Sequence, residues 1–245
     1  MQILPRVYLV AGDDYYPMER PGLDSNVYLL DAGTCLVLVD CAFDEVSLEA
    51  IFRRIRRWGM DPDQISHLLL THAHFDHSGN AKRLREQGVQ IVAHVSEAEG
   101  IEAGDLRTIP YAFDRDFPTT PVDVKLGAGD EPKPWQLPIG DLQLEAIHAP
   151  GHTDGCLIYA MNVGDQRVWF TGDLCFRGGP LTAESVLAWN GSIDYDRQRL
   201  LQTLVELQRE KVDVILPGHR LLCLERAKTL VNTALVLAIQ AWGNR

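Results

Sequence analysis

The sequence predicts an α/β fold in which two β-sheets face each other and helices cover their outer surfaces. Three observations carry this prediction. The 245-residue chain is 46% hydrophobic and 23% charged, which is typical of a globular protein with a substantial core. Short apolar strands alternate with amphipathic helices in the N-terminal part, and a second group of strands closed by helices follows. No repeat or change of composition divides the sequence, so we expect a single domain over residues 1–245.

Five strands and two helices are expected in the N-terminal part. The strands are short apolar or β-branched runs bounded by Gly, Asp or Pro, at residues 7–10, 25–30, 35–39, 65–70 and 89–93. The first helix, residues 44–58, carries an apolar stripe formed by Val46, Leu48, Ile51, Phe52 and Ile55. Gly59 ends this helix, and a shorter helix at residues 81–87 ends before Gly88.

The middle of the chain, residues 104–138, is expected to be a long irregular excursion because prolines interrupt every regular pattern. Such loops usually form walls or lids of functional sites. Aromatic residues in and around it argue against a disordered linker. Beyond it we expect strands at residues 142–147, 156–161, 167–171 and 212–216, and helices at residues 196–211 and 224–242.

The charge balance limits the partners of this protein. A formal net charge of −11 disfavours nucleic acid and anionic membranes as partners. A local basic patch stays open as an alternative, because four arginines cluster in one segment: Arg53, Arg54, Arg56 and Arg57. We therefore expect a small-molecule substrate, with no nucleic acid and no membrane, and a homodimer stays open beside a monomer.

The cysteines and the first residues bear on the cellular compartment. The five cysteines are scattered, odd in number and form no CxxC pair, which favours a reducing compartment. The apolar start of the chain is broken by Pro5 and Arg6, so it does not resemble a signal peptide or a membrane span. We expect a cytoplasmic location, although a mature form whose signal had been removed would look the same.

The candidate functional site begins at residues 72–77, His-Ala-His-Phe-Asp-His, directly after a predicted strand. Residues two apart on an extended chain point the same way, so His72 and His74 can aim two imidazoles at one ion. Asp76 and His77 lie where the chain turns into the next helix, and they can face a neighbouring ion. Imidazole and carboxylate ligands suit zinc, and also iron, manganese or cobalt.

Three further candidates follow three other predicted strands. His152 and His219 each come after a Pro-Gly pair, and Asp173 comes after Thr-Gly. Pro-Gly forces a tight turn that presents the next side chain, and functional residues gather at such strand ends. A lone histidine is more often a core or surface residue than a ligand, so we set three aside: His67, His94 and His148. The remaining cluster predicts a metal site for one or two ions.

The order HxHxDH, Pro-Gly-His, Thr-Gly-Asp and Pro-Gly-His resembles that of the metallo-β-lactamase-fold hydrolases, and the resemblance spans nearly the whole chain. It implies a four-layer αβ/βα sandwich with the active site at one edge between the sheets. The implied cofactors are two divalent ions, zinc first, with iron, manganese or cobalt as alternatives. The implied ligands are His72, His74 and His152 at one ion, Asp76, His77 and His219 at the other, and Asp173 at both.

The resemblance also implies a mechanism. Two close ions lower the pKa of a shared water, which then attacks a carbonyl carbon. Asp76 is the predicted catalytic residue, because its carboxylate can accept a proton and return it to the leaving group. Asp40, after the strand ending at residue 39, is assigned the hydrogen bond that orients a ligand histidine; a simple turn residue is the open alternative. Cys175 is interpreted as a small buried apolar residue rather than a nucleophile.

The residues separate the candidate substrates in part. Asp173 counts against a dedicated β-lactamase, because one subclass carries a cysteine at that place and another lacks the bridging aspartate; weak promiscuous activity stays open. Phe176 and the following Arg-Gly-Gly resemble glyoxalase II-like thioesterases, whereas acyl-homoserine-lactone lactonases carry a tyrosine at the position of Phe176. The residues that would recognise glutathione are not evident.

A small thioester, lactone or related ester is therefore the expected substrate. Aromatic candidates for an apolar pocket beside the metals are Phe75, Tyr111, Phe113, Phe176 and Trp189, of which more than half are expected to be core. A persulfide dioxygenase-like oxidoreductase with one iron is the alternative, because it would share most of the same ligands.

Overall fold

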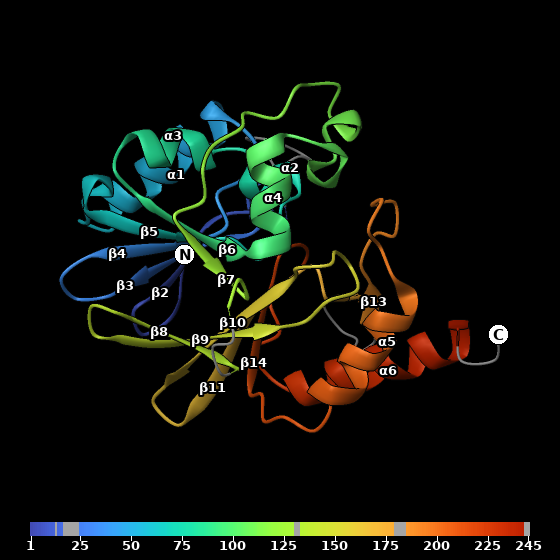
Figure 1. Ribbon diagram of the computed structural model, residues 1–245. Helices are drawn as coiled ribbons and strands as arrows, with labels where there is room; N and C mark the ends of the chain where they lie inside the picture. Colours follow the sequence, from blue (N-terminus) through green and yellow to red (C-terminus); the bar gives the residue numbers. More distant parts are fainter. Residues whose placement is uncertain (13, 17–24, 130–132, 179–184, 243–245) are drawn as a thin grey trace.

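Two large sheets packed face to face form the inner layers of the computed structural model, and helices cover both outer faces (Figure 1). The structure describes residues 1–12, 14–16, 25–129, 133–178 and 185–242. The α/β class and the four-layer order predicted from the sequence are confirmed. The arrangement follows from the strands, whose two apolar faces must both be covered.

The first sheet has the order β1-β2-β3-β4-β5-β6-β7. Neighbours from β1 to β4 are antiparallel, and neighbours from β4 to β7 are parallel. Parallel neighbours need crossovers, which the helices α1 to α4 provide. The bounds are β1 (Gln2–Leu4), β2 (Val7–Ala11), β3 (Val27–Asp31), β4 (Leu36–Val39), α1 (Glu45–Arg57), β5 (Ile65–Leu69), α2 (Phe75–Ser78), α3 (Ala81–Glu86), β6 (Gln90–His94), α4 (Val95–Ala103) and β7 (Val124–Leu126).

The second sheet has the order β14-β11-β10-β9-β8, and helices α5 and α6 pack on its outer face (Figure 1). A small hairpin of β12 and β13 follows β11 along the chain and packs against α6. The bounds are β8 (Trp135–Ile139), β9 (Leu142–His148), β10 (Leu157–Val163), β11 (Gln166–Gly172), β12 (Cys175–Arg177), β13 (Ser185–Leu187), α5 (Arg197–Leu207), β14 (Val214–Pro217) and α6 (Ala227–Trp242).

Three apolar layers hold these elements together. One lies between the sheets, one between the first sheet and the helices α1, α3 and α4, and one between the second sheet and α5 and α6. In α1, the Asp44 carboxylate accepts hydrogen bonds from the Val46 and Ser47 amides and so starts the helix. The predicted stripe of α1 is buried except for Val46, which is 57% exposed; that residue was wrongly assigned to the stripe.

The expected irregular excursion at residues 104–138 is partly wrong. It contains two single helical turns and the strands β7 and β8. β8 includes Pro138, a residue that cannot donate to a ladder. Because β8 is an edge strand of its sheet, it tolerates a proline that a central strand would not.

Other differences lie at short elements and helix ends. The three-residue strands β1, β12 and β13 and the helix α4 were not expected, because they carry little periodic signal. The helix α5 ends at Leu207, four residues before the predicted end at residue 211. The last helix begins at Ala227 rather than at residue 224, because Cys223 still pairs with Ile215 and Arg226 has a left-handed backbone (φ 59°).

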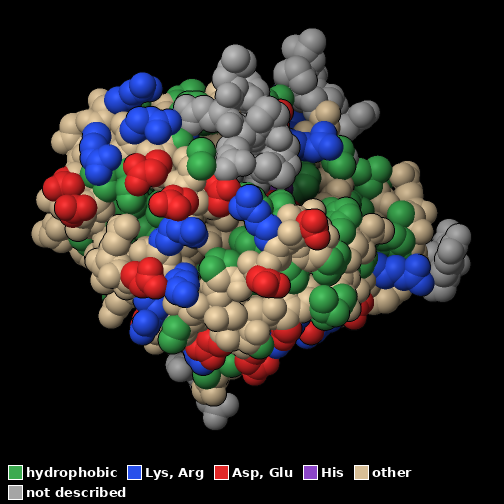
Figure 2. Space-filling view, turned by 90° about the horizontal axis from the view of Figure 1, so that it is seen from above, with side chains coloured by type: hydrophobic (Ala, Val, Ile, Leu, Met, Phe, Trp, Pro, Cys, Tyr) green, Lys and Arg blue, Asp and Glu red, His purple; other side chains and the backbone are tan. Residues whose placement is uncertain are grey.

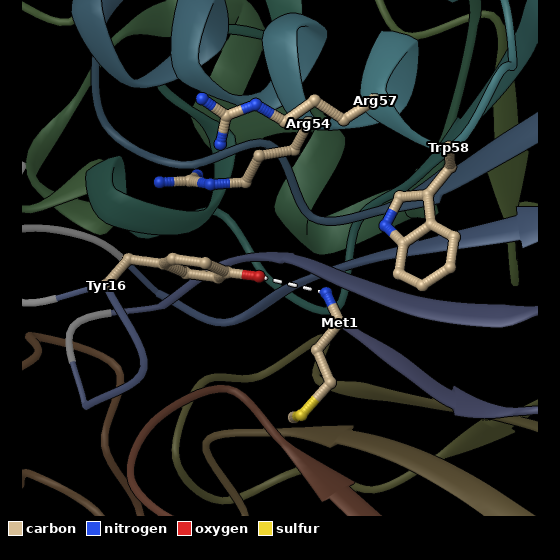
Figure 3. A pocket seen from close by; sticks show the side chains of 5 residues that line it. All are labelled: Met1, Tyr16, Arg54, Arg57 and Trp58. Carbon is tan, nitrogen blue, oxygen red and sulfur yellow. Dashed lines mark hydrogen bonds between the residues drawn. The ribbon is translucent and has the colours of Figure 1, made fainter.

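The arginine cluster of α1 is not a uniform exposed patch. Arg54 is only 7% exposed; its Nη1 donates to the Val10 carbonyl at 2.6 Å, and its guanidinium lies 3.7 Å over the Tyr16 ring. Arg54 and Arg57 line a pocket of about 290 Å³ with Met1, Tyr16 and Trp58 (Figure 3). The amino group of Met1 donates to the Tyr16 hydroxyl there at 3.0 Å (Figure 3). Arg54 therefore joins α1 to the N-terminal strands rather than serving a basic surface.

Three further features of the described residues are the surface charge, the character of the helices and the state of the cysteines. Figure 2 shows Lys and Arg side chains interspersed with Asp and Glu over the face seen from above. In the described part of the chain, no helix combines the length and the apolarity that a bilayer crossing would need. All five cysteines are free thiols, and Cys175 is buried, as expected.

One histidine set aside above gives a testable pH dependence. His94 caps α4, accepts from the Ser96 amide at 3.3 Å and stacks on His148, with ring centroids 4.3 Å apart. Burial, together with the neighbouring His148, lowers the pKa of His94 from 6.5 to about 4. The folded state therefore binds fewer protons than the unfolded state between these values, so stability present above pH 6.5 is lost as the pH falls toward 4.

Between pH 7 and 4.5 we expect the free energy of unfolding to fall by about 1 kcal/mol more in the wild type than in His94→Asn. This magnitude is reduced from the full effect of the pKa shift because the ring is partly hydrated. Asparagine keeps a capping acceptor and removes the titration. Urea unfolding at several pH values measures this difference. Parallel pH profiles of the two proteins would contradict it.

Candidate metal centre

The predicted site residues meet at one edge of the sandwich, although they come from distant parts of the sequence. His72 and His74 follow β5, and Asp76 and His77 lie in the short helix α2 that comes next. The remaining four each follow another strand: Asp40 after β4, His152 after β9, Asp173 after β11 and His219 after β14. Strands of both sheets therefore deliver side chains to the same place, as ligand sites in sheet proteins commonly require.

The first group consists of three imidazoles. Ligand atoms of His72, His74 and His152 lie within 4.8 Å of one another, and all three residues are buried. His74 Nδ1 lies 3.2 Å from His152 Nε2. The Nε2 atoms of His72 and His74 are buried and have no hydrogen-bond partner among the described residues. Buried polar atoms normally have a partner, so these two buried nitrogens without one, together with the close approach of His74 Nδ1 to His152 Nε2, suit a group of imidazoles that binds a metal ion.

The second group combines carboxylate and imidazole. Ligand atoms of Asp76, His77 and His219 also lie within 4.8 Å of one another. His219 Nε2 lies 3.0 Å from Asp76 Oδ2 and 3.2 Å from His77 Nε2. Such a mixed set of nitrogen and oxygen ligands fits zinc, iron, manganese or cobalt.

Asp173 lies between the two groups. Its Oδ1 is 3.3 Å from His77 Nε2, and its Oδ2 is 3.7 Å from the Nε2 atoms of both His152 and His219. Asp173 Oδ1 is also buried without a hydrogen-bond partner in the part of the chain that is described. This position is where a bridging ligand would have to lie, and the bridging role stays a prediction.

Burial and mutual charge set the protonation of the cluster. Burial, added to by neighbouring imidazoles, holds the pKa values of His72 and His74 well below the usual range. Burial would also lower the pKa of His77, but the carboxylates of Asp173, Asp76 and Asp40 raise it well above the usual range. Burial opposes ionisation of Asp173, yet the imidazoles of His219 and His77 keep its pKa well below the usual range. The neutral histidines offer lone pairs and the carboxylates favour positive charge, which together suit a cation.

Three of the candidate ligand histidines make a polar contact through Nδ1, the ring nitrogen that does not face the cluster. His77 Nδ1 donates to Asp40 Oδ2 at 2.8 Å, the contact that the predicted orienting role of Asp40 requires. His72 Nδ1 lies 3.0 Å from Thr71 Oγ1, and His152 Nδ1 donates to the Trp189 carbonyl at 3.0 Å. These bonds leave Nε2 as the free ligand atom.

Asp40 is itself fixed by Thr71, whose amide donates to its Oδ1 at 2.8 Å. The backbone of Asp40 is left-handed (φ 58°), a conformation that residues other than glycine adopt rarely. Such local strain is typical of functional positions held by their surroundings. The contacts of Thr71 and of the Trp189 carbonyl were not predicted, because a hydroxyl next to a ligand and a backbone oxygen carry no specific sequence signal.

The turn that carries His219 is held by the first sheet. Asn26 Nδ2 donates to the carbonyls of Pro217 and Arg220, at 3.0 Å each, and the Tyr28 hydroxyl donates to Pro217 at 2.6 Å. A Cβ at Gly218 would lie 2.4 Å from Asp173 Oδ1 and 2.6 Å from His77 Cε1. Gly218 is therefore required because the site occupies the space of a side chain, in addition to any need of the turn.

The five aromatic candidates differ in their burial and in their distance from the cluster. Phe75 and Phe113 pack in or against the core under the first sheet's helices, and Phe176 is buried with its ring 5.8 Å from His219. Trp189 is 47% exposed, and its ring lies 6.0 Å from that of His74. Tyr111 is 49% exposed, and its hydroxyl donates to the Gly191 carbonyl at 3.0 Å. Of the run after Phe176, Gly179 lies outside the described residues.

Comparisons with known proteins agree with this geometry. The sequence profile of the metallo-beta-lactamase superfamily matches residues 20–219. The human protein named acyl-coenzyme A thioesterase MBLAC2 is 28% identical over 170 residues, which are 61% of this chain and 54% of that protein. Hydroxyacylglutathione hydrolase GloC of Haemophilus influenzae is 31% identical over 119 residues, 46% of this chain and 50% of that protein. The chain spans about half the length of the curated relatives it matches.

A solved structure gives the same fold. The subclass B3 metallo-beta-lactamase BJP-1 of Bradyrhizobium japonicum superposes with a TM-score of 0.72 and covers 98% of this chain and 91% of that one. The two are 24% identical, so the likeness concerns the fold alone.

Proposed function

This chain belongs to the metallo-beta-lactamase superfamily, and we propose that it is a metal-dependent hydrolase of acyl thioesters or related esters. The observation that supports this most is the convergence of seven metal-ligand candidates from both sheets on one edge of the fold. The names of the thioesterase and hydroxyacylglutathione hydrolase relatives favour a thioester among the substrates expected from the sequence.

The protein's own residues would divide the work in the following way. Divalent ions bound there would supply Lewis acidity and a water of lowered pKa. His72, His74 and His152 would hold one ion, Asp76, His77 and His219 the other, and Asp173 would contact both. Asp76 would also accept a proton and return it to the leaving group. Burial opposes its ionisation, but the neighbouring His77 and His219 keep its pKa below the usual range, so it is ionised near neutral pH.

An apolar border beside the three imidazoles supports an acyl substrate. The Trp189 ring contacts His74 and is half exposed, and Ile193 of the same loop is 60% exposed. A Cβ at Gly191 would lie 1.9 Å from Trp189 Cζ2, so the indole lies directly against that glycine. Exposed apolar side chains next to a polar centre are typical of a substrate-binding surface. We propose that the acyl chain lies against the Trp189 indole.

Replacing Trp189 with alanine is expected to raise KM for long acyl chains about tenfold relative to short ones, equivalent to about two methylene groups at about 0.8 kcal/mol each. The backbone carbonyl that accepts from His152 is kept in this variant. Steady-state kinetics over acyl chains of increasing length measures the effect. Trp58→Ala, which removes an exposed tryptophan directly after α1, is the control. An equal loss for every chain length would contradict the assignment.

The function is tested by metal analysis of protein purified without chelator, followed by a substrate panel of thioesters, lactones, β-lactams and phosphodiesters. We expect hydrolysis of a thioester or ester that chelation abolishes and added zinc restores. Activity that survives complete removal of metal would overturn the proposal. Bound iron with oxygen consumption on a persulfide, and no ester hydrolysis, would establish the oxidoreductase alternative instead.

A further inference from the structure

Glu97, a residue that the sequence analysis did not single out, lies buried between the two segments that carry the three-imidazole group. It belongs to the first turn of α4, and its exposed fraction is 2%. An acidic residue in a first helical turn usually faces solvent or bonds to its own helix N-terminus. The Glu97 carboxylate instead bonds to chain segments outside its helix.

Three short hydrogen bonds define its contacts. Oε2 accepts from the Ala73 amide at 2.7 Å. Oε1 accepts from the Thr153 hydroxyl at 2.8 Å and from the Gly155 amide at 2.7 Å. Ala73 lies between His72 and His74, and Thr153 follows His152. One carboxylate therefore joins the segment after β5 in the first sheet to the β9–β10 connection of the second.

No Lys or Arg of the described residues forms an ion pair with Glu97. Burial raises the pKa of its carboxyl to about 7, although the Thr153 hydroxyl and the two amides counteract the shift. A buried carboxyl without a cationic partner costs stability, so the residue is poorly explained as a source of folding free energy. What it supplies is a fixed geometry between two loops.

We propose that Glu97 is a positioning residue that sets the spacing of His74 and His152, and thereby the cation affinity of the three-imidazole group. The inference rests on the metal centre proposed above. The bond to Ala73 fixes the peptide unit between His72 and His74, and the bonds to Thr153 and Gly155 fix the turn after His152. Other residues hold the second group, namely Asp40 at His77 and Asn26 at the turn of His219.

Close packing at Gly155 supports a fixed distance. A Cβ on Gly155 would lie 2.7 Å from Glu97 Oε1 and 2.7 Å from His94 Nδ1. The β9–β10 connection therefore lies against the carboxylate with no room for a side chain. A small displacement of either loop would strain these bonds, and outer hydrogen bonds of this kind typically change metal affinity about 10–100-fold.

The test is a titration of metal-free full-length protein with Co²⁺, read by the visible absorption of histidine-bound cobalt and by competition with a chromophoric chelator. Glu97→Gln replaces one acceptor oxygen by an amide that cannot accept. Thr153→Val removes one donor with little change of shape, and Thr153→Ser restores the hydroxyl. Glu99→Gln, an exposed position of the same helix, is the matched control. His74→Ala identifies the binding step that belongs to the three-imidazole group.

We expect Glu97→Gln and Thr153→Val to weaken that step about 10–100-fold and to leave any other step unchanged. Thr153→Ser and Glu99→Gln should bind like the wild type. If Glu97→Gln does not fold, the Thr153 pair decides. Equal affinities for valine and serine at position 153, or equal weakening of every step, would overturn the role of Glu97. A wild-type chain that binds no Co²⁺ would overturn the metal centre itself, and this inference with it.

Discussion

Replacing His74 with alanine is expected to lower kcat/KM for the ester or thioester substrate by about 10³-fold or more, the scale of losing a charge-stabilising group in a preorganised site. The imidazole belongs to the three-residue group, and its Nε2 is buried without a hydrogen-bond partner among the described residues. Alanine removes both ring nitrogens, including the Nδ1 that lies 3.2 Å from His152 Nε2, and opens space between His152 and Trp189. The remaining two imidazoles would hold a cation weakly, because three protein ligands are the usual minimum for catalytic zinc.

The measurement combines kinetics with metal content. His74→Ala should lose one metal-binding step and the chelator-sensitive activity together. His67→Ala is the matched control, since His67 lies on β5 a few residues earlier, contacts Ser66 and was set aside as a ligand. A His74→Ala protein with full activity and unchanged metal content would contradict the assignment. Equal losses in both variants would show that the effect comes from disturbing β5.

The layers of the fold could be predicted because burial dictates them. Central strands such as β10 and β11 carry runs of buried residues that are covered on both faces, and they read as such in the sequence. The strands β7 and β8 could not be predicted, because each is an edge strand with one neighbour, and β8 contains Pro138. The helix α4 carries Gly100 in its middle and a buried Glu97, so it lacks the usual amphipathic period.

The candidate site could be predicted only where its chemistry is local. The segment 72–77 concentrates ligand side chains, and each of the three remaining ligand candidates, His152, Asp173 and His219, follows a Gly at or just after the end of a strand. The contacts that hold these side chains are different in kind. Glu97 meets Thr153 across 56 positions of sequence, and Trp189 acts on His152 through a backbone oxygen. The sequence offers one sign that Glu97 has a special role, namely a charged residue at a position that should face the core. This sign can be recognised only once α4 is known to be a helix.

Replacing Asp76 with asparagine is expected to lower kcat about 10²–10⁴-fold, the usual contribution of a positioned general acid or base, while KM changes little. Asparagine keeps an oxygen that can face His219, 3.0 Å away, but its amide cannot take up a proton near neutral pH. If the Asp76 carboxylate only bound metal, the amide oxygen of asparagine would take its place with a lower metal affinity, and saturating metal would restore the activity.

Kinetics at saturating zinc, with measured metal content, separates these roles. We expect the loss in kcat to persist when the variant is fully loaded, whereas Asp76→Ala should show the same loss in kcat and weaker metal binding as well. Wild-type kcat in the loaded Asp76→Asn protein would contradict the proton-transfer role and leave Asp76 as a ligand candidate alone.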